Sequence, residues 1–129
     1  MYSHMMVGSN DIERSKIFYD ALFGAIGGKE GRQDAKGRLA YMHNGGVFMV
    51  TPPIDGQPAT HGNGSTIGFA VDGPTQADAW HRAGCEAGGT PCEDPPGERQ
   101  GSLGPLYLAY LRDPDGNKLC ALHRVPTAA

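Results

Sequence analysis

Cysteine and histidine side chains are the groups in this sequence best suited to nucleophilic or metal chemistry. Its three cysteines are Cys85, Cys92 and Cys120, and none of them lies in a Cys-x-x-Cys pair. An odd number of thiols without paired spacing predicts reduced side chains rather than a disulfide framework. The chain also has five histidines, but a Ser or Cys triad requires proximity in three dimensions, which spacing does not supply.

His4 is the histidine that strand periodicity places on an open surface. It lies in the short apolar stretch from Tyr2 to Gly8, where alternate side chains point to opposite faces of a strand. We expect Met5 and Val7 to face the helix that follows. His4, Met6 and Gly8 then face the other side.

The stretch from Ser65 to Val71 shows the same alternation more clearly. Its bulky residues share one face, and its small residues, Thr66, Gly68 and Ala70, share the other. Because the bulky face should pack on a helix, the small face leaves space for a ligand.

Two helices and two sets of strands position these residues. The first helix is predicted to start at Asp11, with Asn10 as its N-cap and Glu13 completing a capping box, and to end near Gly24. The second is predicted over residues 75–87. Strands are predicted over residues 25–29, 38–43 and 47–51 in the first half, and over 90–93, 107–112 and 118–123 in the second. The chain therefore has the order strand, helix and three strands twice, which indicates an α+β protein.

Composition excludes several classes of partner. Eleven Lys and Arg against 14 Asp and Glu give a net charge of −3, so there is no basic footprint for nucleic acid. The longest apolar run, Leu106 to Leu111, is far shorter than the roughly 20 residues of a membrane span. The N-terminal residues lack the pattern of a secretion signal, so we expect a cytoplasmic protein without membrane or nucleic-acid partners.

Three stretches then carry a family resemblance. They are His4-Met-Met-Val-Gly-Ser-Asn-Asp-Ile-Glu-Arg-Ser-Lys-Ile-Phe-Tyr19, Thr66-Ile-Gly-Phe-Ala-Val-Asp72 and Asp113-Pro-Asp-Gly-Asn-Lys-Leu-Cys-Ala-Leu122. In this order they resemble the opening strand and helix, the strand that opens the second module, and the closing hairpin of the vicinal oxygen chelate superfamily. That group includes glyoxalase I, bleomycin resistance proteins, fosfomycin resistance enzymes and extradiol dioxygenases.

The resemblance implies two βαβββ modules that form an open, barrel-like cavity, commonly completed in a homodimer. We therefore expect one domain over residues 1–129, with modules at about 1–53 and 64–125. Metal-dependent members hold a divalent ion with four side chains, usually His, Glu or Gln, from the first, fourth, fifth and last strands. The corresponding positions here are His4, Met49, Thr66 and Cys120.

Only His4 among these four is a ligand of the usual type. Catalytic Zn²⁺ needs about three strong donors, and hard ions need oxygen ligands, so we expect no divalent metal and no cofactor. Metal-assisted isomerisation, ring cleavage and epoxide opening all require that Lewis acid, so we do not expect these reactions. His4, Met49 and Cys120 are also a soft set that could bind Cu(I), but methionine and cysteine are ordinary linings of an apolar pocket.

Two functions follow as hypotheses. The favoured one is a binding protein, similar to the bleomycin resistance branch, in which a homodimer encloses a small organic molecule. The residues expected to line this site are Met6, Met49, Thr66, Gly68, Tyr107 and Cys120. The alternative is a lyase or isomerase like lactoylglutathione lyase, or a dioxygenase-like enzyme, using His4 and a Zn, Ni, Mn or Fe ion bound in a non-standard way.

Five residues have both a functional and a structural interpretation. Tyr107 and Tyr110 have opposite strand parity, so only one of them can face the cavity. Arg99, in the expected loop 95–101, could clamp an anion, although a solvated charge is favoured. His61 could be a displaced metal ligand in a Gly-rich loop, and Cys120 a nucleophile with His4 as its base. An exposed loop histidine and an inert buried thiol are the favoured interpretations.

Overall fold

The computed structural model describes residues 1–127 and contains two helices and nine strands. The first half comprises β1 (Met5–Gly8), α1 (Ile12–Gly24), β2 (Arg32–Gln33), β3 (Leu39–His43) and β4 (Gly46–Thr51). The second half comprises β5 (Ile67–Ala70), α2 (Pro74–Glu86), β6 (Thr90–Pro91), β7 (Gly97–Gly101), β8 (Gly104–Arg112) and β9 (Lys118–Arg124). The predicted α+β class, with strand, helix and strands in each half, is confirmed.

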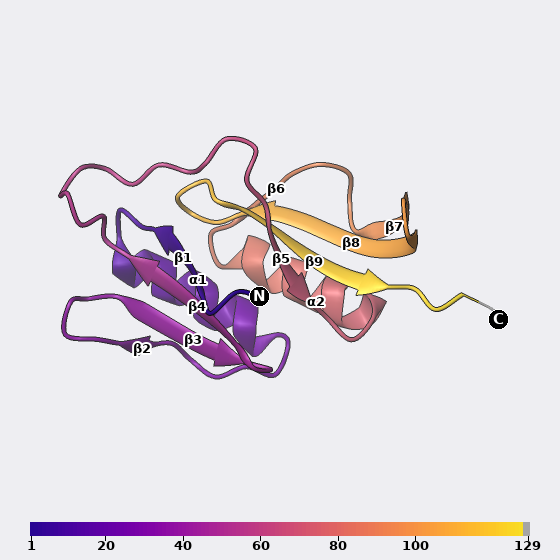
Figure 1. Cartoon of the computed structure of the whole chain (residues 1–129), viewed down its shortest axis with the longest axis horizontal. Coiled ribbons are helices and arrows are strands. Elements are labelled where there is room, and N and C mark those ends of the chain that lie inside the picture. The colour runs from indigo at the N-terminus through magenta and orange to yellow at the C-terminus, as the bar shows by residue number, and fades with distance from the viewer. Residues whose placement is uncertain (128–129) are drawn as a thin grey trace.

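Each half forms its own mixed sheet. The strand order is β1-β4-β3-β2 in the first sheet and β5-β9-β8-β6 in the second, where β7 also pairs with β8. β1 runs parallel to β4, and β5 runs parallel to β9. Figure 1 shows the two sheets side by side, with α1 and α2 both behind them. The opposite face of the sheets is therefore free of helices, and neither sheet closes into a barrel.

The core lies between the helices and the sheets and is continuous across the two halves. α1 buries its apolar side, and α2 buries Ala77, Trp80 and Gly84. A Cβ atom on Gly84 would lie 2.6 Å from the Leu111 side chain and 2.9 Å from that of Leu22. A glycine is needed here because α2, α1 and β8 approach one another too closely for a side chain.

The turn between β8 and β9 ties the second half to the first through a buried carboxylate. Asp113 is 4% exposed, and its Oδ2 accepts hydrogen bonds from the Tyr19 hydroxyl at 2.6 Å and the Asn117 amide at 2.8 Å. Its Oδ1 accepts from the backbone N–H groups of Asp115 and Asn117. Burial and the Asp113 charge raise the pKa of the Tyr19 hydroxyl well above its ordinary value, so this group remains a donor.

Asp115 makes a second set of contacts with the start of α1. Its Oδ1 accepts from the Arg14 guanidinium at 2.8 Å and from the Asn10 backbone N–H at 2.9 Å. Because the Asp115 side chain is only 1% exposed, this pair is shielded from solvent on one side. The sequence Asp113-Pro-Asp-Gly-Asn117 is thus a joint between the halves as well as a tight turn.

The structure corrects two local predictions in the first half of the chain. Asp11, not Asn10, is the N-cap of α1, and its carboxylate accepts from the Arg14 N–H. Asn10 instead exchanges two hydrogen bonds with the backbone of Ala59, at 2.7 and 3.2 Å, which hold the long connection between the sheets. Residues 25–29 contain the C-cap of α1 and a turn with Gly27 at φ +83°, so the next strand begins only at Arg32.

The segment expected to be a loop around Arg99 contains β7. This strand pairs with β8 from Gly97, opposite Leu108, to Gly101, opposite Gly104. Its glycines and charged residues weaken the strand signal, and the neighbouring strand supplies the missing stabilisation. Within residues 1–127, no helix combines the length and apolar character needed to cross a bilayer.

We predict that Asp113→Ala lowers the free energy of unfolding by about 3 kcal/mol, because it leaves the Tyr19 hydroxyl and the Asn117 amide buried without an acceptor. Tyr19→Phe removes one donor and should cost about 1 kcal/mol. Urea unfolding at neutral pH measures both changes. Asp55→Ala, in the connection between the sheets, is the matched control and should stay within about 0.5 kcal/mol of wild type. A loss for Asp113→Ala no greater than that of the control would contradict this role.

Candidate functional site

The candidate site lies on the face of the two sheets that points away from α1 and α2, which we call the open face. Strand register places Met6 opposite Met49 in the first sheet. In the second sheet Gly68 lies opposite Cys120, and Cys120 lies opposite Tyr110. The parity argument made for β1 and β5 agrees with the structure for Val7 and Phe69, which pack into the core. Met5, which was expected to face the helix, is instead 37% exposed.

A cavity of about 400 Å³ lies where the two sheets meet, and we call it the seam cavity. β1 pairs only with β4 and β5 only with β9, so the facing edges of β1 and β5 leave a gap. The cavity brings together Met6 and Thr66, which were both predicted to bind a ligand. Its lining consists of Met5, Met6, Val7, Gly8, Thr60, Gly62, Ser65, Thr66, Ile67, Asn117 and Lys118.

The positions where metal-dependent relatives carry ligands have unequal exposure in this chain. His4 and Thr66 are exposed, Met49 is half-buried and Cys120 is 4% exposed. The His4 Nδ1 atom lies 2.8 Å from the Ser3 hydroxyl oxygen. No cluster of three or more His, Cys, Asp or Glu side chains that could hold an ion exists among residues 1–127. These residues do not fit a catalytic Zn²⁺ or Mg²⁺, because only the His4 imidazole is a strong donor.

Cys120 has the environment of an unreactive thiol. Burial raises its pKa to about 11, against a smaller opposing effect of a hydrogen bond from Tyr110. The Cys120 Sγ atom lies 3.5 Å from the Ala121 carbonyl oxygen. Since a thiolate is the nucleophilic form, a thiol with this pKa is protonated at neutral pH.

A polar corner of the open face lies beside Cys120, and sequence reasoning missed it. The Lys118 ammonium lies 5.0 Å from the centre of the Tyr110 ring and forms an ion pair with Glu93. Lys118 also lines the seam cavity. Lys118 has the same strand parity as Cys120 in β9, and this pattern in the sequence could have identified it. An anionic or carbonyl group could reach this ammonium only in competition with Glu93.

Tyr107 and Arg99, which were considered as binding residues from the sequence, have side chains that bond to other groups of the protein. Tyr107 is on the helix-facing side of β8, where its hydroxyl donates to Asp78 of α2 at 2.7 Å. Tyr110 takes the open-face position, so Tyr107 is not available to a ligand there. The Arg99 guanidinium donates to the carbonyl oxygens of Asp94 and Pro95, at 3.1 and 2.9 Å. The guanidinium therefore bonds to the backbone just before β7.

His61 does not line the seam cavity, although its neighbours Thr60 and Gly62 do. It is exposed, and its ring packs over the turn at Gly116, where an added Cβ atom would be 2.9 Å from His61 Nδ1. This position matches the loop interpretation.

Comparison with known proteins gives consistent similarities. Residues 2–121 match the model of the Glyoxalase/Bleomycin resistance protein/Dioxygenase superfamily. The crystal structure of a glyoxalase/bleomycin resistance protein from Albidiferax ferrireducens is 61% identical, with a TM-score of 0.93, over 96% of this chain and 99% of that chain. The fosfomycin resistance protein FosX from Mesorhizobium loti shares the fold, with 15% identity and a TM-score of 0.66, over 97% of this chain and 92% of that chain. No curated protein sequence matches the chain.

We predict that Cys120 reacts with iodoacetamide at pH 7.5 about 100-fold more slowly than an unperturbed thiol, because its raised pKa leaves little thiolate. Its rate should keep rising up to at least pH 10, since deprotonation occurs only near pH 11. Peptide mapping by mass spectrometry measures the rate at each cysteine, with Cys92 as the internal comparison. A rate for Cys120 that levels off below pH 9 would contradict this environment.

Proposed function

The chain belongs to the glyoxalase/bleomycin resistance protein/dioxygenase superfamily, and we propose that it binds a small organic molecule on the open face without a catalytic divalent metal. One observation carries the proposal. At the positions where metal-dependent relatives hold an ion, the chain presents a thioether, a neutral hydroxyl and a protonated thiol beside His4. Such groups line a binding pocket well but bind hard divalent ions poorly.

The residues around the seam cavity suggest the chemistry of the ligand. Met6 and Met49 offer flexible apolar surface that adapts to different shapes. Lys118 and Tyr110 offer one charged or polar contact at the edge of that surface. We therefore expect a mostly apolar molecule that carries a single carbonyl, hydroxyl or acidic group.

A second copy of the chain is proposed to complete the site. The open face of one chain is covered by no helix, and its sheets do not curve into a closed barrel. Met6 is 38% exposed and Met42 is 71% exposed on this face. Packing two such faces together would remove these side chains from water and enclose the ligand.

The alternative remains an enzyme of lyase or isomerase type. The observation that favours it is the exposed His4 ring, which is accessible to a substrate and has the Ser3 hydroxyl at its Nδ1 atom. A histidine in this position could act as a general base. Conversion of a bound compound that is lost in His4→Gln would favour this function over binding alone.

We predict that the purified protein retains less than about 0.1 equivalents of Zn, Ni, Fe or Mn after dialysis, because a single imidazole does not hold a divalent ion. Elemental analysis by plasma mass spectrometry measures the content. The matched control restores donors in a triple variant, Met49→Glu, Thr66→His and Cys120→Glu, which should bind about one Zn²⁺ per chain. One equivalent in wild type that disappears in His4→Ala would overturn the proposal.

We also predict that a panel of small aromatic and aliphatic carboxylic acids contains compounds that raise the thermal midpoint by several degrees through binding to the native state. Met49→Glu should abolish this shift, because a charge on the open face repels an acid and disrupts apolar contact. Ile17→Glu, on the exposed side of α1, is the control and should preserve it. Chromatography after incubation should recover the compound unchanged. A shift that survives Met49→Glu would contradict binding at this site.

A further inference from the structure

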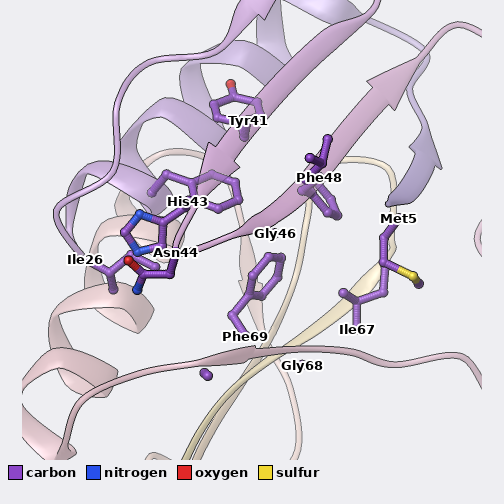
Figure 2. Close-up of a pocket in the computed structure, with 13 residues that line it drawn as sticks. Met5, Ile26, Tyr41, His43, Asn44, Gly46, Phe48, Ile67, Gly68 and Phe69 are labelled. Carbon is purple, nitrogen blue, oxygen red and sulfur yellow. The ribbon is translucent and has the colours of Figure 1, made fainter. Parts of the chain in front are cut away.

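A second cavity opens between β4 and β5, and it differs from the open face in its lining. Figure 2 shows Phe69 extending from β5 toward β4 and Phe48, with His43 and Asn44 on one side and Met5 and Ile67 on the other. We call this space the aromatic cleft. Its volume is about 240 Å³. It shares Met5 and Ile67 with the seam cavity. It also includes Gly68, which lies opposite Cys120 on the open face.

The cleft exists because the pairing of β1 ends early. β1 pairs with β4 from Met5, opposite Phe48, to Gly8, opposite Thr51. The first residues of β4, Gly46 and Val47, therefore have no strand beside them on that edge, and β5 leaves its own edge unpaired there. This gap gives access from outside to aromatic side chains that otherwise belong to the core.

Three phenylalanines form rigid walls for a flat molecule. The Phe69 ring lies 5.5 Å from that of Phe23 at 89° and 5.4 Å from that of Phe48 at 67°. Phe23 and Phe48 are each 4% exposed, and Tyr41 stacks on Phe23 at 4.7 Å, so the walls are held by packing. Edge-to-face and offset-stacked contacts with such rings favour another aromatic ring over a saturated one.

The polar side chains of His43 and Asn44 lie together at one side of the cleft. Among the described residues, the side chains of His43 and Asn44 make no hydrogen bond, and both line the cleft. They adjoin the β3–β4 turn, in which Asn44 at φ +47° and Gly45 at φ +82° form a tight two-residue hairpin. Their positions are therefore set by the backbone, and their free nitrogen and oxygen atoms can accept or donate a hydrogen bond.

The charge and size of the cleft limit the kinds of ligand that it can bind. Among residues 1–127, no Asp, Glu, Lys or Arg side chain lines the cleft, so a charged molecule would lose its hydration without gaining a partner. An apolar cavity of roughly 150 Å³ is enough for benzene, and drug-sized ligands occupy about 300 to 1,000 Å³. We propose that the aromatic cleft is a second binding site, distinct from the seam cavity, for a neutral planar molecule of one or two rings that carries a hydrogen-bond donor.

The probe for this proposal is 5-bromoindole, which is flat and neutral, carries one N–H donor and has a bromine atom that is located by anomalous scattering. We expect saturable binding in a nuclear magnetic resonance titration and a bromine peak among Phe23, Phe48 and Phe69 in crystals. The charged analogue 4-bromobenzoate should bind in the cleft at least 10-fold more weakly. Binding of 5-bromoindole that does not saturate, or a bromine peak elsewhere, would overturn the proposal.

Variants separate this site from the open face. His43→Phe keeps a ring beside Phe23 but removes the nitrogen atoms, and should weaken 5-bromoindole binding about fivefold or more. His123→Phe, on β9 and outside the cleft, is the matched control and should leave affinity unchanged. Met49→Glu, on the open face, should also leave it unchanged. Loss of binding in Met49→Glu with none in His43→Phe would overturn the cleft and leave the open-face proposal standing.

Discussion

The arrangement of this protein depends on the buried carboxylate of Asp113. A charged group that is 4% exposed is costly to bury unless its oxygen atoms are saturated with donors, and four hydrogen bonds provide them. One donor is Tyr19 of α1, which lies 94 residues earlier in the chain. The carboxylate therefore orders the β8–β9 turn and also fixes the second sheet against the helix of the first half. Asp115 repeats the connection at the start of α1 through Arg14 and Asn10.

The joint holds two sheets side by side without merging them. Because β1 and β5 each pair on only one edge, the sheets meet along a line that has no hydrogen-bonded ladder. The two cavities lie along this line for the same reason, since an unpaired edge leaves room that side chains only partly fill. Small and thioether side chains line the seam cavity, whereas the aromatic cleft is lined by rings that pack under the helices. One topological feature thus produces two chemically different recesses.

The candidate site on the open face carries little charge at the positions compared with metal ligands. A fold that supports an ion in some relatives needs several strong donors that converge, and in this chain burial keeps the Cys120 thiol protonated while Met49 and Thr66 carry no charge. The charge that does lie nearby, on Lys118, is balanced by Glu93 and rests against the Tyr110 ring. These side chains are the basis of our proposal that the open face binds an apolar molecule with one polar group.

Much of this protein was determined by local patterns in the sequence. Alternation of large and small residues placed Met6, Thr66 and Gly68 on the open face, because side chains of a strand alternate strictly. The order of elements and the Asp113-Pro-Asp-Gly-Asn117 turn also followed from residue types. Where two neighbours were equally suited, as with Asn10 and Asp11 at the helix start, local propensity could not decide, and a contact with Ala59 selected the cap.

Only the tertiary structure decided which face of β8 carries each tyrosine and which distant residues meet. The run from Leu106 to Leu111 is apolar on both faces, so the sequence does not indicate which face points to the helices. The structure decides this, because Tyr107 bonds to Asp78 on the helix side. The aromatic cleft joins Phe23, His43 and Phe69, which are far apart in the chain and lie in three different elements. Such proximity arises from the packing of whole sheets and helices, and no periodicity within a single element contains it.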